Sequence, residues 1–387
     1  MTQTTMPTPV GDLDHLIREG LSALDITQAE FDRAVQRYTG LGAVLDERWA
    51  STRGSNFVFP QGSFNLGTVV RNVSRNDDID IDIVAVRDIS KYSISQEELK
   101  DEVGDAARAY ARLPGSGRPE LEESSRCWTL IWPDMHMDIL PAIPNVDGGG
   151  DNLLITDRDV RSWLMSNPSG YAQWFKARMS MSLLATRAAE SKQLDIQDVP
   201  TWRHRTVLQR VVQALKRHRD VYFAHHLHDR PSSIVLTTLA AHAYNGGSDL
   251  YSSLRQVVTD MQDFLELRDD EWYLENPAQS EENFVDGWAD DPARAGHFFS
   301  WLRAAQAEFA QFETKSGLQH VMPLFEASFG GRFATGARQG LADILGTARE
   351  ESTLRMKTGG TLATASTTLP AASRPVRSHQ FAGGSSI

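Results

Sequence analysis

The chain has 387 residues, of which 41% are hydrophobic and 23% are charged, and its formal net charge at pH 7 is −12. This length and composition indicate a globular protein of two domains, or of one large two-lobed unit. The negative charge argues against a protein that coats nucleic acid, because such proteins rely on many contacts from Lys and Arg to phosphate. We therefore expect no stable nucleic-acid binding.

Cysteine content and hydropathy bear on where the protein works. A single cysteine, Cys127, excludes an intrachain disulfide and favours a reducing compartment. No apolar stretch approaches the roughly 20 residues that a membrane-spanning helix needs. The N-terminus lacks the basic start and apolar region of a signal peptide. These features predict a cytoplasmic protein that does not contact the membrane.

The first expected elements are a flexible leader over residues 1–26, which contains a short helical patch, and a long helix after it. Thr27 and Glu30 have the spacing of a capping box. Apolar side chains then recur at helical spacing, at Phe31, Val35, Tyr38, Leu41, Leu45 and Trp49. Residues 51–56 are rich in Ser and Gly and end this helix.

Residues 57–140 read as a mixed α/β unit. The pattern predicts an extended piece at 57–60, a turn at 61–63, a strand over 79–86, a helix near 96–112, and paired strands near 118–132 and 134–140.

The second half of the chain is predicted to be mainly helical. The clearest helices lie at about 204–223 and 233–245, within a helical region over 151–350. Residues 351–387 are rich in Thr, Ala, Ser and Gly. We predict a disordered tail there, because few large apolar groups are present to offset the entropy of ordering.

The most informative segment alternates Ile and Asp over residues 79–83. Side chains alternate faces along a strand, so Asp80 and Asp82 share one face and the isoleucines line the other. Two neighbouring carboxylates repel each other unless a cation lies between them. Carboxylate oxygens suit Mg²⁺, although a solvated edge strand that carries acids is the alternative.

Two flanking segments strengthen the metal hypothesis. At Gly62-Ser63 a glycine allows close approach to a phosphate, the serine adds a hydroxyl donor, and a helix that starts there offers its positive end. A plain turn is the alternative. Asp138 lies between apolar neighbours at the end of a later predicted strand. An isolated carboxylate there is costly unless it faces the same cations.

This combination resembles the nucleotidyltransferase signature of the DNA polymerase β-like superfamily. The resemblance implies an α+β fold with a polymerase β-like core, in which a mixed sheet is backed by helices. Residues 27–150 would form this core with an N-terminal spine helix. Residues 151–350 would form a C-terminal helical lobe that closes a central active-site cleft. The implied cofactor is a pair of Mg²⁺ ions, with Mn²⁺ as a substitute.

A narrower resemblance covers roughly residues 27–345. Several runs are similar to the bacterial cGAS/DncV-like nucleotidyltransferases (CD-NTases): residues 61–71, 137–144, 166–171, 208–210, 215–220, 276–277 and 282–288. That family makes cyclic di- or trinucleotide second messengers in CBASS antiphage defence. The implied substrates are nucleoside triphosphates, with ATP as one and GTP or a pyrimidine nucleotide as candidates for another. The messenger would act on an effector that senses it.

The resemblance also implies roles for single residues. Asp80, Asp82 and Asp138 would bind the metals and carry catalysis. Nucleotide binding would fall to Gln61, Gly62, Ser63, Lys216 and Ser233, with the glycine and serines and the lysine on the phosphates. A solvated helix position is the alternative for Lys216. A helix cap is the alternative for Ser233, and Ser232 is equally well placed.

Two further hypotheses remain open. The same metal chemistry could transfer a nucleotide to an RNA 3′ end or to a protein, and a nucleotide-sensing scaffold with an inactive site is a third reading. Residues 378–384 resemble the end of relatives that ubiquitin-like conjugation enzymes join to other molecules. The extra residues 385–387 depart from that pattern.

Overall fold

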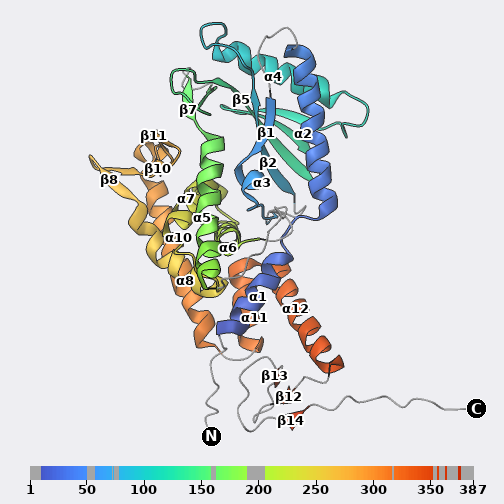
Figure 1. Cartoon of the computed structure of the whole chain (residues 1–387), viewed down its shortest axis with the longest axis vertical. Helices are drawn as coiled ribbons and strands as arrows, with labels where there is room; N and C mark the ends of the chain where they lie inside the picture. Colours follow the sequence, from blue (N-terminus) through green and yellow to red (C-terminus); the bar gives the residue numbers. More distant parts are fainter. Residues whose placement is uncertain are drawn as a thin grey trace, which may run out of the picture.

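The computed structural model describes residues 10–49, 57–71, 73, 78–157, 163–189, 205–315 and 318–351, and three short strands beyond them. Figure 1 shows a sheet with two long helices at one end of the molecule and a helical lobe at the other. The predicted α+β class with a C-terminal helical lobe is confirmed. Over the residues described, no helix has the length and apolar character needed to cross a bilayer.

A seven-stranded mixed sheet forms the first lobe. Its strands are β1 (Phe57–Gln61), β2 (Ile79–Val86), β3 (Glu120–Glu123), β4 (Trp128–Trp132), β5 (Met135–Pro144), β6 (Leu153–Ile155) and β7 (Leu164–Ser166). The order is β1-β2-β5-β4-β3, and β6 pairs with β5 and β7. Only the central pair β2–β5 is parallel among these pairings. The predicted strand over 79–86 is confirmed to the residue.

Helices α2 (Gln28–Trp49) and α4 (Gln96–Ala111) cover one face of this sheet. Ile79, Ile81 and Ile83 are at most 1% exposed and pack with both helices. The predicted capping box of α2 is present, since the Thr27 amide donates to Glu30 Oε2 at 2.7 Å. The apolar face of β2 therefore fixes which way its acidic face points.

The helical lobe surrounds α6 (Val207–Tyr222), whose residues 208–220 are all buried. Its other members are α5 (Pro168–Ala189), α7 (Ser233–Ala243), α8 (Leu250–Asp260), α9 (Gly287–Asp290), α10 (Ala293–Thr314), α11 (Leu318–Phe329) and α12 (Gly331–Glu350), with 3₁₀ turns at Leu227–Asp229 and Met261–Phe264. Four short strands form two hairpins beside it: β8 (Glu266–Arg268), β9 (Glu271–Tyr273), β10 (Glu275–Asn276) and β11 (Gln279–Asn283). A Thr206–Gln209 capping box starts α6.

The prediction of a flexible leader is wrong over its second half. Residues 10–22 form helix α1 (Val10–Ser22), and its apolar side chains Leu13, Leu16, Ile17 and Leu21 are at most 2% exposed. Helix α1 packs against α12, from the far end of the chain, so the partner that buries it is invisible to local reading.

The predicted domain limits also differ from the structure. The core sheet continues past residue 150 through β6 and β7, so the helical lobe begins only at α5. In the predicted tail the structure describes three two-residue strands that pair with one another, β12 (Arg355–Met356), β13 (Leu362–Ala363) and β14 (Arg374–Pro375). Residues 378–384 lie outside the described residues.

Candidate active site

The three predicted acidic residues meet on the central strands of the sheet. In the parallel β2–β5 pair, Asp82 lies opposite Asp138 and Asp80 lies opposite His136. Residues opposite each other in adjacent strands point to the same side of a sheet, so the three carboxylates share the face opposite the buried isoleucines. Side chains distant in sequence thus converge as predicted.

The charges of these acids act on one another. Burial, followed by the nearby charges of Asp138 and Asp80, raises the pKa of Asp82 from 3.8 to about 7. Burial also raises the pKa of Asp138, although a hydrogen bond from Thr129 Oγ1 at 2.6 Å favours its ionised form. This face carries unfavourable negative charge that a cation would relieve.

Helix α3 (Gly62–Leu66) starts directly beside Asp82. Gln61, the last residue of β1, lies opposite Asp82 in the antiparallel register. Gly62 has a φ of +56°, and a Cβ there would lie 2.1 Å from Asp82 Oδ2. Only glycine allows this approach. Gly62 and Ser63 thus form a helix start against the acidic face. We call these two residues the phosphate cradle, after the role that the sequence predicts for them.

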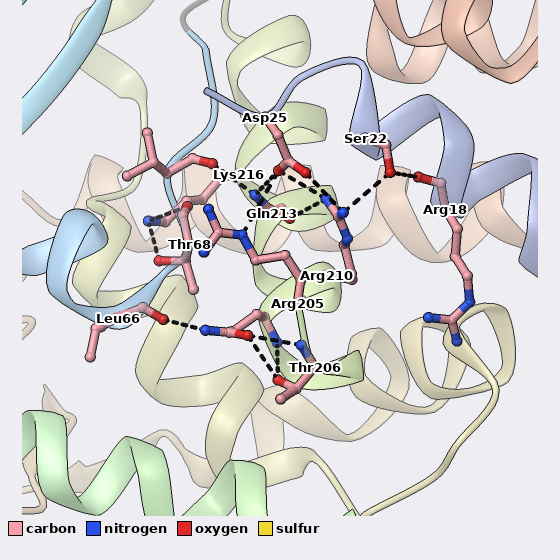
Figure 2. A network of polar contacts seen from close by, with 12 residues as sticks. Arg18, Ser22, Asp25, Leu66, Thr68, Arg205, Thr206, Arg210, Gln213 and Lys216 are labelled. Atoms are coloured by element: carbon pink, nitrogen blue, oxygen red, sulfur yellow. Dashed lines mark hydrogen bonds and ion pairs between the residues drawn. The ribbon is translucent and has the colours of Figure 1, made fainter. Parts of the chain in front are cut away.

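Lys216 reaches the same region from α6. Its ammonium is buried and lies 3.3 Å from Thr68 Oγ1 and 3.5 Å from the Thr68 carbonyl (Figure 2). Burial and the charge of Arg219 lower the pKa of Lys216 to about 8, whereas the charge of Asp82 opposes this shift. The reading of Lys216 as a solvated surface residue is therefore wrong.

Ser233 is the first residue of α7 and is exposed. Its hydroxyl accepts a hydrogen bond of 3.0 Å from Arg219 Nη1. The helix-capping position belongs to Ser232, whose side chain makes no capping hydrogen bond. Ser233 is thus joined to a buried cation one turn beyond Lys216.

Three further side chains lie near the site, and none of them was given an individual role from the sequence. Thr129 orients Asp138, and His136 lies 3.5 Å from carboxylate oxygens of Asp80 and Asp78. Arg219 is buried, and its charge interacts with that of Asp80. Arg219 follows Lys216 by three positions on the helix, which is a signal the sequence does contain. Thr129 lies opposite Asp138 because of the register between β4 and β5, and no local pattern in the sequence predicts that register.

The oxygen atoms on the acidic face suit Mg²⁺. Within the described part of the chain, no three His, Cys, Asp or Glu side chains form a ready-made metal cage. Mg²⁺ usually takes one or two carboxylates and completes its shell with water and substrate phosphates. Asp80, Asp82 and Asp138 fit that mode, because they supply hard oxygen atoms and lie beside the phosphate cradle.

Two hollows of the surface play no part in this site. One lies over α2 and is lined by Phe31, Val35 and Gly40, among others. The other lies at the end of α4, beside Arg108, Arg112 and Arg118. Neither contains a residue of the acidic face or the phosphate cradle.

A carboxylate cluster on a mixed sheet, beside a glycine-serine helix start and a buried lysine, defines a nucleotidyltransferase site. Residues 14–178 match the family model of the Second Messenger Oligonucleotide or Dinucleotide Synthetase domain (SMODS). A c-di-GMP synthase of Roseivirga ehrenbergii is 27% identical over 281 residues, which cover 70% of this chain and 72% of that protein. The cyclic dinucleotide synthase CdnG of Bradyrhizobium diazoefficiens is 25% identical over 307 residues, covering 72% and 70%.

Solved structures show the same fold. The structure of Bradyrhizobium diazoefficiens CdnG in complex with GTP has a TM-score of 0.67 at 21% identity and covers 84% of this chain and 97% of that one. Vibrio cholerae DncV, a cyclic AMP-GMP synthase, has a TM-score of 0.59 at 15% identity, with 84% and 98% covered. Over residues 14–178 the chain thus carries a match to a nucleotidyltransferase domain, and it is similar to bacterial cGAS/DncV-like nucleotidyltransferases in sequence and in fold. The domain match and the two named synthases support a nucleotidyltransferase that makes a cyclic oligonucleotide.

Proposed function

We propose that this enzyme joins nucleoside triphosphates into a cyclic di- or trinucleotide at the acidic face, with release of pyrophosphate. The observation that carries the proposal is the apposition of Asp82 and Asp138 on neighbouring parallel strands, beside the start of α3. Mg²⁺, or Mn²⁺ in its place, held by Asp80, Asp82 and Asp138 would supply the positive charge that activates the attacking hydroxyl and stabilises the leaving group.

The chain's own side chains then have distinct tasks. The backbone amides and hydroxyl at Gly62-Ser63 face the phosphates at a helix start, where the helix dipole favours an anion. Lys216 brings a buried positive charge that a triphosphate would stabilise. Ser233 offers a hydroxyl beside Arg219 from the opposite lobe. Gln61 ends the strand that leads into the cradle and lies beside Asp82.

The relatives support the choice of substrates, and the family resemblance supports the biological role. ATP is a predicted substrate, and the relative named as a c-di-GMP synthase supports GTP as another. The structure of CdnG in complex with GTP supports the same choice. We place the product in CBASS antiphage signalling, where it would act on a messenger-sensing effector. Conjugation enzymes acting on residues 378–384 remain a prediction.

Product analysis tests this proposal. The purified protein is incubated with Mg²⁺ and a mixture of ATP, GTP, CTP and UTP, treated with phosphatase, and examined by mass spectrometry. A phosphatase-resistant cyclic oligonucleotide is expected from the wild type and none from Asp82→Asn. Asp101→Asn, which changes an exposed acid on α4, is the matched control and should retain activity.

A parallel incubation with radiolabelled nucleotides and added tRNA separates the rival functions. Radiolabel that remains on the tRNA or on protein, with no small product, would show transfer to a macromolecule instead. An unchanged product yield in Asp82→Asn would remove the acidic face from the mechanism. No turnover by the wild type under any tested activating condition would favour a nucleotide-sensing scaffold.

A further inference from the structure

One face of α6 hydrogen-bonds the chain segment that follows the phosphate cradle. Gln209 Nε2 donates to the carbonyl of Leu66 at 2.8 Å, and Gln213 Nε2 donates to the carbonyl of Val69, also at 2.8 Å. Lys216 continues the same face, because positions four and three residues apart lie above one another on a helix. Figure 2 shows Lys216 directed at Thr68, in the segment that follows α3.

In both glutamines the amide nitrogen donates a hydrogen bond and the amide oxygen accepts one. Gln213 Nε2 also donates to Asp25 Oδ1 at 3.0 Å, and its Oε1 accepts from Arg210 Nη1 at 3.0 Å. Gln209 Oε1 accepts from the Thr206 amide at 2.8 Å. Both glutamines are at most 1% exposed. A buried amide whose donors and acceptor are engaged has one favourable pose, because any other leaves polar groups unsatisfied.

Gly67 permits the close contact between α6 and this segment. Its φ is +66°, and a Cβ there would lie 2.5 Å from Gln209 Nε2 and 2.7 Å from Arg205 Nη1. The residue directly after the cradle helix therefore lets the α6 side chains approach the backbone itself. The contact fixes the backbone that carries the cradle, in addition to its side chains.

We propose that Gln209 and Gln213 are positioning residues for the triphosphate. They fix the register between α3, which carries Ser63, and the turn of α6 that carries Lys216. This inference rests on the proposed nucleotide site. Gln209 of α6 and Leu66 of α3 are 143 residues apart along the chain, so the position of α3 relative to α6 depends on side-chain contacts such as this one. A ligand that must meet both groups at once, the β- and γ-phosphates of a nucleoside triphosphate, loses affinity when one of them shifts.

The test compares two ligands that differ only in their phosphates. Gln209→Met and Gln213→Met keep an unbranched side chain of similar size and remove the amide. The Kd of GTP and of GMP is measured by calorimetry with Mg²⁺ present. We expect the Kd of GTP to rise about five- to tenfold and that of GMP to stay unchanged. Gln306→Met is the matched control, since Gln306 Nε2 donates to the Val258 carbonyl at 2.7 Å within the helical lobe.

Lys216→Met, measured in parallel, separates the two levels of the argument. If it leaves the GTP affinity unchanged, the proposed phosphate site is wrong. If it weakens GTP binding but both glutamine variants bind GTP as the wild type does, the positioning role is wrong. Equal weakening of GTP and GMP would also overturn the inference, because it indicates general damage. If Gln213→Met does not fold, Gln209→Met decides the question, since it loses a single hydrogen bond to the end of α3, at the Leu66 carbonyl.

Discussion

Asp82→Asn should stabilise the metal-free enzyme at neutral and alkaline pH. The pKa of Asp82 rises from 3.8 to about 7 on folding, through burial and then the charges of Asp138 and Asp80. The folded state therefore binds more protons than the unfolded state between these values, so stability falls as pH rises through this window. A difference of about three pKa units corresponds to roughly 4 kcal/mol.

The asparagine amide resembles the protonated acid and carries no charge at any pH. We expect Asp82→Asn to exceed the wild type in unfolding free energy by up to about 4 kcal/mol at pH 8, and by under about 2 kcal/mol at pH 5. Added Mg²⁺ should narrow the gap at pH 8, because a ligand of the folded state stabilises only the protein that binds it. We also expect the variant to form no product in the assay described above, so that it gains stability and loses function.

Urea unfolding in EDTA at pH 5 and pH 8, repeated with Mg²⁺ at pH 8, measures these differences. Asp101→Asn serves as the control, since this acid is exposed on α4 and should shift neither curve. A gain that is the same at both pH values, or no gain at pH 8, would falsify the view that Asp82 is a buried, destabilised carboxylate.

Three further predictions concern the rest of the site. Thr129→Val removes the 2.6 Å hydrogen bond to Asp138, so the pKa of Asp138 should rise further. We expect kcat to fall about tenfold near pH 7 and to recover as the pH rises. Thr129→Ser, which keeps the hydroxyl, should restore kcat. The affinity for GTP should decline above about pH 8, where Lys216 loses its charge in the free enzyme, and titration calorimetry should show no such decline in Lys216→Met. Gly62→Ala should lower the activity by roughly 100-fold or more, because the added Cβ would lie 2.1 Å from Asp82 Oδ2 and would displace the groups of the site. Gly115→Ala is its control: φ there is also positive, at +87°, but no atom lies within 4 Å of the added Cβ, so backbone strain is imposed without a clash and kcat/KM should hold.

The local elements were largely readable from the sequence because their causes are local. The strand over 79–86 follows from alternating Ile and Asp, and α2 and α6 begin at capping residues. The convergence of Asp80, Asp82 and Asp138 was predicted from the cost of lone carboxylates beside apolar neighbours and from the family resemblance. The parallel β2–β5 register brings them together.

What the sequence by itself determined, then, is the long helix after residue 27, the acidic strand with its two faces and the glycine-serine turn, since period-two alternation and capping chemistry act over a few residues. Tertiary structure alone decided that residues 10–22 form a buried helix, because α12 covers them from the other end of the chain. It also decided that Lys216 is buried against Thr68 and that Thr129 orients Asp138. These contacts join segments that are distant along the chain and carry no local signal for each other. They therefore stabilise the fold only once those segments have packed together.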